Sequence, residues 1–242
     1  MKIGMKVKWA FMILICIGLL VLWFASTQRF GQGNIQSIDI KIESGGKPAM
    51  ITEKEILKHL EEEEVTISGV DIAQTDLNRI EQALARFPFV RESRVYLNHD
   101  QMLFIEVAQR TPIVRVMPER GKPHYIDESG NRFPLSDLYT ADVPVATGDI
   151  DDELSTKLYT LSRHVHESVF WKRSIEQIFV SGRGEFSFIT KLGSQQVIFG
   201  DTDRIAAKFE KLENFYRRGL GKVGWDTYRI INVKYKDQVV CK

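Results

Sequence analysis

The hydrophobic pattern begins with an apolar run at residues 9–28 that contains no charged residue. A helix rises about 1.5 Å per residue, so this run is long enough to cross a hydrocarbon core of roughly 30 Å. Lys2, Lys6 and Lys8 precede it, which by the positive-inside tendency places residues 1–8 in the cytoplasm as a short tail. A cleaved secretory signal is the alternative, but its apolar region usually has about 7–15 residues. We therefore predict a single transmembrane helix at residues 9–28, with the rest of the chain exported.

Residues 38–42 alternate between isoleucine and charged side chains, which predicts a half-buried strand. Thr52 and Glu55 match a capping box, and the helix that they open has an apolar face of Ile56, Leu57 and Leu60. A second helix is predicted from about Thr75 to Pro88, because proline disfavours helix in the residue before it. Its apolar face is spaced at i, i+3, i+7 and i+10 and consists of Leu77, Ile80, Leu84 and Phe87.

Two further alternating stretches, at residues 95–97 and 103–107, flank a turn at residues 98–101 and predict a hairpin. The order of elements is then strand, helix, helix, strand, strand. Two helices on one face of a three-stranded sheet make an α+β layer.

The second half of the chain has a longer series of predicted elements. Residues 112–120 are expected to be extended, residues 125–133 to turn between two short strands, and residues 137–149 to be irregular, with Pro144 and Gly148 as breakers. An amphipathic helix is predicted at residues 152–168, and strands at 175–181, 185–191 and 195–199. Asp201 or Thr202 is expected to cap a helix that carries Phe209 and Tyr216. The chain is expected to end on a strand at residues 230–235 and a short piece, QVVC, at residues 238–241.

Composition and charge narrow the class of protein. The chain is 43% hydrophobic and 27% charged with a net charge of +1, which is typical of a globular protein and gives no support to nucleic acid as a partner. Its two cysteines, Cys16 in the apolar run and Cys241, cannot bridge within one folded chain. The exported part must therefore rest on hydrophobic cores rather than disulfides.

No pattern of catalytic or metal-binding residues emerges. His164 and His166 would diverge on a helix and could not hold one metal ion. Neither G-x-S-x-G nor H-E-x-x-H occurs. Trp171 and Trp225 are expected to be buried anchors of the second half rather than a glycan-stacking platform. We predict that the protein is not an enzyme and uses no cofactor, metal or small-molecule substrate.

The order of these parts, with several short runs, is similar to a known family. LARFPFVRESRVY at residues 84–96, followed by LFIEVAQRTPI at 103–113, resembles a POTRA (polypeptide-transport-associated) domain. The second half then resembles the β domain of the FtsQ/DivIB cell-division family. The resemblance lies in the order YIDESGNRFP, VPVATGD, a helix, FGD, another helix and YRIINVKY. The resemblance implies a POTRA domain of β-α-α-β-β order at residues 34–112 and a mixed α/β domain, built on an antiparallel sheet, at 113–242. Asn-Val-Lys at residues 232–234 replaces the Asp-Leu-Arg usual in the last strand.

The resemblance implies a non-enzymatic divisome scaffold in the cytoplasmic (inner) membrane at the division septum, with its bulk in the periplasm. It would bind FtsB/FtsL-type partners, could also bind other divisome membrane proteins, and would help control septal peptidoglycan synthesis. The alternative is a POTRA-containing protein of an outer-membrane assembly or secretion system. Such proteins usually carry a β-barrel as well, and the chain lacks the necessary series of long alternating strands.

An exposed strand edge offers unpaired N–H and C=O groups that a partner strand can complete. Residues 230–241 are expected to present such an edge, since no later element can cover them. By resemblance, the partner-binding residues are Lys234, Tyr235, Asp237 and Val239. Tyr235 could equally be a core or sheet-surface aromatic, since tyrosine serves in both roles. In the POTRA half, Arg86, Phe89 and Arg91 are candidate contacts for another partner.

Overall fold

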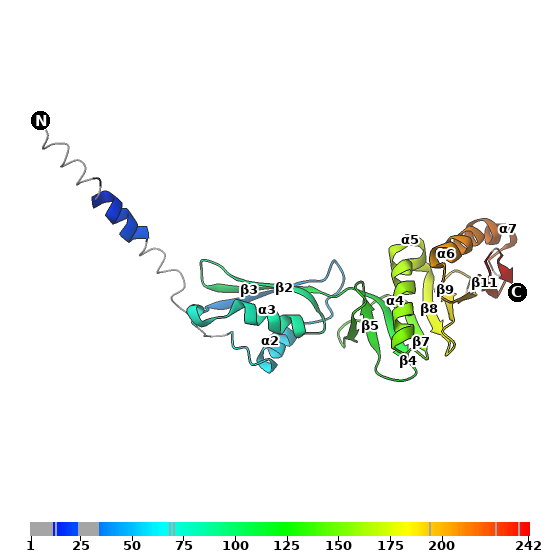
Figure 1. Ribbon diagram of the computed structural model, residues 1–242, viewed down its shortest axis with the longest axis horizontal. Helices are drawn as coiled ribbons and strands as arrows, with labels where there is room; N and C mark the ends of the chain where they lie inside the picture. Colours follow the sequence, from blue (N-terminus) through cyan, green and yellow to red (C-terminus); the bar gives the residue numbers. More distant parts are fainter. Residues whose placement is uncertain are drawn as a thin grey trace, which may run out of the picture. The chain divides into compact units, whose positions relative to one another are not determined.

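The computed structural model describes residues 12, 14–23, 34–67, 69, 71–193, 195–225, 227–236 and 238–242. Its contacts divide the chain into two compact units. The first holds the residues up to Glu43 together with Thr52–Ala108, and the second holds Ser44–Ile51 together with Gln109–Lys242. Each unit has its own sheet (Figure 1).

The predicted membrane span at residues 9–28 extends beyond the described residues. Within it, Met12 and residues 14–23 are helical, and their side chains are exposed. In the part of the chain that the structure describes, no helix is both long and apolar enough to cross a bilayer.

The described part of the first unit has the predicted element order. Strand β1 (Ser37–Glu43) is followed by helices α2 (Glu53–Glu62) and α3 (Leu77–Arg86), with a 3₁₀ turn at Ile72–Gln74 between them. Strands β2 (Val90–Leu97) and β3 (Met102–Gln109) form the hairpin. The sheet order is β1-β3-β2, with β1 parallel to β3 and Ile40 opposite Ile105. Figure 1 shows both helices on one side of this sheet.

Local signals in the sequence explain where these helices begin and end. The capping box at α2 is confirmed: the Thr52 hydroxyl accepts a bond from the Glu55 backbone N–H, and the Glu55 carboxylate accepts one from the Thr52 backbone N–H. Helix α3 is capped by Asp76, one residue after the predicted start, and ends at Phe87 before the proline. The apolar faces of both helices pack on the sheet and bury Ile56, Leu60, Ile80, Leu84, Ile40, Leu103, Ile105 and Val107.

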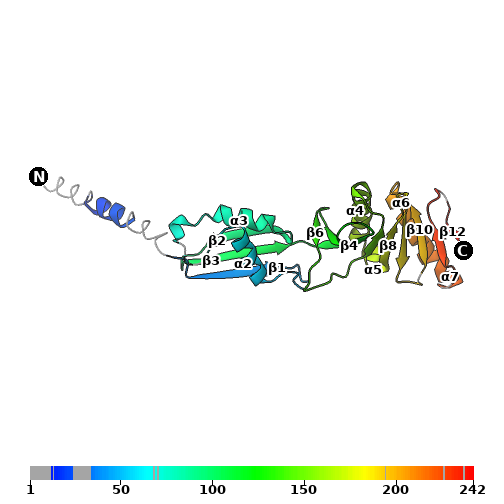
Figure 2. The ribbon, with the colours of Figure 1, turned by 90° about the horizontal axis from the view of Figure 1, so that it is seen from below.

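The second unit contains a nine-stranded sheet in the order β12-β11-β10-β9-β8-β7-β4-β5-β6 (Figure 2). Its strands are β4 (Pro112–Pro118), β5 (His124–Asp127), β6 (Arg132–Pro134), β7 (Val145–Gly148), β8 (Ile175–Val180), β9 (Phe186–Thr190), β10 (Gln196–Gly200), β11 (Ile230–Asn232) and β12 (Val240–Cys241). The expectation of an antiparallel sheet is wrong for three neighbouring pairs among these described strands, since β4–β7, β7–β8 and β10–β11 are parallel. Helical crossovers connect β7 to β8 and β10 to β11, whereas β4 is connected to β7 through β5, β6 and a loop. Each connection is long, as parallel neighbours require.

Strand β7 corrects the prediction that residues 137–149 are irregular. It lies between β4 and β8 in the middle of the sheet, although it has only four residues and is bounded by the proline and glycine that indicated a break. Gly148 has a φ of +119°, and a Cβ at this position would lie 2.0 Å from the carbonyl oxygen of Val180. This glycine therefore allows two backbones to approach closely.

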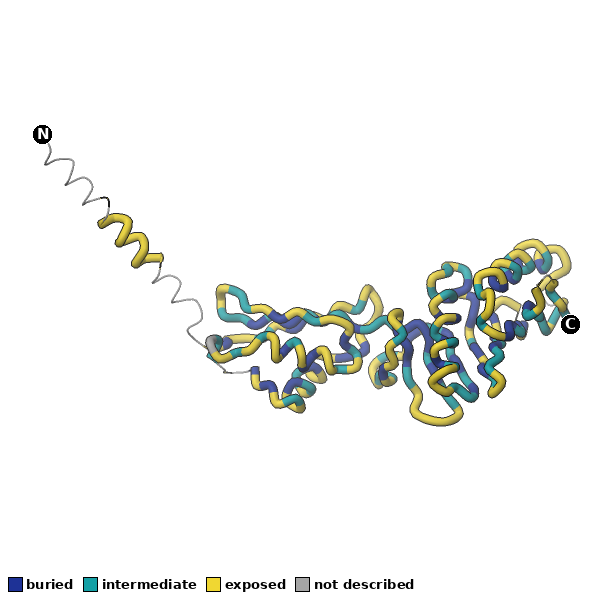
Figure 3. Tube along the Cα trace, in the orientation of Figure 1, coloured by how far each residue is buried: buried dark blue, intermediate teal, exposed yellow. Residues whose placement is uncertain are grey.

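Helices cover one face of the nine-stranded sheet. They are α4 (Asp152–Glu167), α5 (Val169–Ser174), α6 (Ile205–Asn214), its π-helical continuation η2 (Phe215–Leu220) and α7 (Gly221–Val223). The core that they form with the strands is aromatic, with Trp171, Phe209 and Tyr216 fully buried. Figure 3 shows that buried stretches run along the strands and helices of this unit. Trp171 and Phe209 lie 5.2 Å apart between ring centroids.

Two predictions for this region are wrong, and one helix was missed. Helix α5 was not predicted, because its six residues are too few to show a helical period. Neither Asp201 nor Thr202 caps α6; the cap position is Arg204, in a left-handed conformation, while Asp201 pairs with Lys208 at 2.5 Å. Trp225 is 40% exposed rather than buried, with its ring 5.7 Å from that of Tyr216.

Candidate partner-binding edge

Strand β12 forms one end of the nine-stranded sheet, and no described strand lies beyond it. It pairs antiparallel with β11, with Ile231 opposite Cys241. Ile230 and Lys242 donate backbone N–H groups to each other's carbonyls at 3.1 and 3.0 Å. In an antiparallel pair such bonded positions alternate with positions whose groups point the other way. The N–H and C=O of Cys241 therefore face the open side of the sheet.

The short piece expected at residues 238–241 contains β12, but the strand predicted at residues 230–235 is shorter than expected. Strand β11 ends at Asn232, whose side-chain oxygen accepts a bond from the Lys234 backbone N–H at 3.0 Å. The Val233 N–H still bonds to Ile198 of β10, and the Val233 side chain is fully buried. After this point the chain turns away, so β11 is covered by β12 and the free edge belongs to the shorter strand.

Lysine 211 of α6 holds the turn between β11 and β12. Its ammonium donates hydrogen bonds to the carbonyl oxygens of Val233 at 3.0 Å and Gln238 at 3.2 Å, and also to that of Tyr235. A fourth carbonyl, that of Lys236, lies 3.5 Å from the same nitrogen. Sequence reasoning missed this residue, because a lysine on the polar side of an amphipathic helix shows no periodicity or motif.

Lys234 is placed by contacts on two sides. Its ammonium pairs with the carboxylate of Glu185, and this hydrogen bond raises the pKa of Lys234 above its usual range. Its aliphatic chain lies over Gly200, where a Cβ would approach the Lys234 Cγ to 2.9 Å. Glu185 is a second residue that the sequence did not single out.

The remaining predicted residues of this surface differ in exposure. Tyr235 is 50% exposed and lies in the turn, outside any described strand. Val239 and Cys241 are half-buried and pack against the aromatic core from the edge. Asp237 lies outside the described residues. The structure thus brings Lys234, Tyr235 and Val239 to one corner of the second unit.

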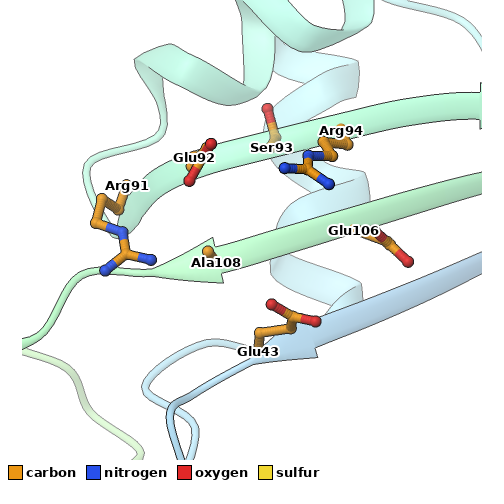
Figure 4. A pocket seen from close by; sticks show the side chains of 7 residues that line it. All are labelled: Glu43, Arg91, Glu92, Ser93, Arg94, Glu106 and Ala108. Carbon is orange, nitrogen blue, oxygen red and sulfur yellow. The ribbon is translucent and has the colours of Figure 1, made fainter.

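The three residues predicted in the first unit do not share one surface. Arg86 pairs with Glu63 at the end of α2. Phe89 is half-buried, with its ring 5.7 Å from that of Phe87. Arg91 instead lines a shallow hollow of about 140 Å³ on the open face of the three-stranded sheet, together with Glu43, Glu92, Ser93, Arg94, Glu106 and Ala108 (Figure 4).

Groups with the geometry of a metal centre are absent from the described residues: no three His, Cys, Asp or Glu side chains lie close enough to hold an ion. His164 stacks on Phe209 with 4.9 Å between ring centroids, and burial lowers its pKa. His166 hydrogen-bonds to Glu128 at 3.1 Å, and burial lowers its pKa as well. Both histidines are therefore engaged in packing or pairing on α4.

Comparison with known proteins identifies both units. Residues 111–242, more than half of the chain, match the family described as FtsQ/DivIB, C-terminal related, and residues 35–108 match the POTRA-like domain. A curated relative, the cell division protein FtsQ of Salinibacter ruber (strain DSM 13855 / M31), is 37% identical over 67 residues. That match covers 27% of this chain and 26% of the relative, so this chain matches about a quarter of that protein's length. With a family match over more than half of its length, the chain belongs to the FtsQ/DivIB family and carries a POTRA-like domain in its first unit.

Proposed function

We propose that this protein is a non-enzymatic scaffold of bacterial cell division. It is anchored in the inner membrane by a span at residues 9–28 and holds its two folded units in the periplasm at the septum. There it binds FtsB/FtsL-type partners and helps control septal peptidoglycan synthesis. Membership of the FtsQ/DivIB family supports the role in division, and the relative in Salinibacter ruber is named a cell division protein.

The single observation that carries the binding mechanism is the open edge of β12. The outward N–H and C=O of Cys241 can pair with an added partner strand, which would extend the nine-stranded sheet by one strand. The exposed ring of Tyr235 and the ammonium of Lys234 lie beside this edge and can contact the partner's side chains. A tether at the membrane would raise the effective concentration of this edge toward other anchored chains.

The test is co-purification of the full chain with the FtsB-type protein encoded in the same genome. A variant that ends at Gln238 lacks β12 and is expected to lose the complex and its accumulation at midcell. Lys222→Ala, an exposed change on α7, is the matched control and should behave as the unchanged protein. Equal recovery of the partner by the shortened chain would contradict strand addition at this edge.

A further inference from the structure

The turn between β11 and β12 is organised around one cation from another element. Four backbone carbonyls, those of Val233, Tyr235, Lys236 and Gln238, converge on the ammonium of Lys211. Backbone carbonyls that gather with their oxygens facing one another repel, because their dipoles are aligned unfavourably. A cation placed at the centre replaces this repulsion with charge-assisted hydrogen bonds, which are the stronger class in proteins.

Strand β12 has little else to hold it. It contains two residues, Val240 and Cys241, and it pairs with residues 230–232 of β11. One further backbone bond, from the Arg229 N–H to the Lys242 carbonyl at 2.7 Å, extends this pairing. This short pairing makes few backbone hydrogen bonds to offset the entropy lost when the chain is ordered. The position of β12 therefore depends on the turn that leads into it. Val239 and Cys241 add partial burial against the core but no further pairing.

We propose that Lys211 is a positioning residue that, by gathering the carbonyls of Val233, Tyr235, Lys236 and Gln238, holds β12 in the register that a partner strand requires. This inference rests on the proposed strand addition and adds a residue that does not itself face the partner. Loss of the ammonium would free the turn and the strand together, while the core residues of α6, such as Phe209 and Leu212, would stay packed.

The test compares the full chain with Lys211→Met, which keeps the aliphatic stem and removes the charge. Hydrogen–deuterium exchange of residues 239–242, measured by mass spectrometry in detergent micelles, should become faster in the variant. Binding of the extracytoplasmic segment of the FtsB-type protein should weaken by at least about tenfold, the loss expected for a hydrogen bond to a charged group. Lys211→Arg, which keeps a cationic donor of similar length, should restore much of both properties.

Lys208→Met is the control on the same helix. Lys208 is buried, and its ammonium bonds to Asp201 rather than to the turn. It should lower the thermal midpoint without faster exchange at residues 239–242. Unchanged exchange, or unchanged affinity, in Lys211→Met would overturn the inference. If the wild-type chain does not bind the FtsB-type segment, the proposed function is contradicted. In that case faster exchange at residues 239–242 in Lys211→Met would still support the ordering of β12 by Lys211.

Discussion

Replacing Cys241 with proline changes the outward side of strand β12 without disturbing the side that pairs with β11. The Cys241 N–H points away from β11, so proline removes no hydrogen bond from the sheet itself. Proline is tolerated on edge strands when its nitrogen faces outward, and it favours the extended conformation that Val240 already has. The bonds between Ile230 and Lys242 should survive. What disappears is one donor to an incoming strand.

The magnitude follows from that single donor. A backbone hydrogen bond contributes about 0.5–1.5 kcal/mol net, but a partner carbonyl left buried and unpaired costs roughly 1–3 kcal/mol. Affinity for the partner should therefore fall by about 5- to 150-fold, since each 1.4 kcal/mol is about tenfold. The pyrrolidine ring would also stand where the partner's backbone has to approach, so the upper part of this range is expected.

The assay is a titration of the full chain in nanodiscs with the extracytoplasmic segment of the FtsB-type protein. Cys241→Val, which keeps the N–H and a side chain of similar size, should bind within about twofold of the unchanged chain. Exchange of the Lys242 amide verifies that β12 remains paired with β11 in the proline variant. Wild-type affinity in Cys241→Pro, with that pairing intact, would refute partner addition through this amide.

Two further predictions concern the fold of the second unit. Gly148→Ala places a Cβ 2.0 Å from the Val180 carbonyl oxygen at a positive φ, so the free energy of unfolding in urea should fall by roughly 3 kcal/mol. Gly182→Ala, where the added Cβ meets only a side-chain oxygen at 3.6 Å, should change it by less than about 1 kcal/mol, and equal effects would contradict the close approach. Burial lowers the pKa of His164 below its unfolded value of about 6.5, so its contribution to stability is present above that pH and is lost as the pH falls. The thermal midpoint of the unchanged chain should therefore fall between about pH 7 and pH 5. It should fall less in His164→Phe, which keeps an aromatic ring on Phe209. An equal fall in both proteins would rule out His164 as the source of the pH dependence.

The sequence predicts the first unit well because its signals are local. The capping box at Thr52, the proline after Phe87 and the alternating residues of the hairpin each act within a few residues. The helical period also identified α4 and the apolar face of α6 correctly. Trp171 was correctly expected in the core, since a large apolar ring has few other stable places.

The parts that could not be predicted depend on contacts between distant residues. Strand β7 has four residues, and its neighbours β4 and β8 determine its conformation more than its own sequence does. The early end of β11 depends on the Asn232 side chain and on Lys211, which lies on a helix about twenty residues upstream of the turn. Residues 230–241 were expected to present an open edge, and Tyr235 and Val239 were placed near it by family resemblance. Which backbone groups face outward depends on the pairing of β12 with β11, and no side-chain pattern shows that pairing.

Protection of the Cys241 amide on partner binding tests strand addition most directly. In the free chain this amide faces the open side of β12 and should exchange rapidly, whereas the Lys242 amide, bonded to Ile230 at 3.0 Å, should already be protected. Residue-resolved hydrogen exchange with saturating FtsB-type partner is predicted to slow the Cys241 amide by at least about tenfold, as expected for a newly bonded strand position. A partner that binds while this amide exchanges as fast as before would contradict the account.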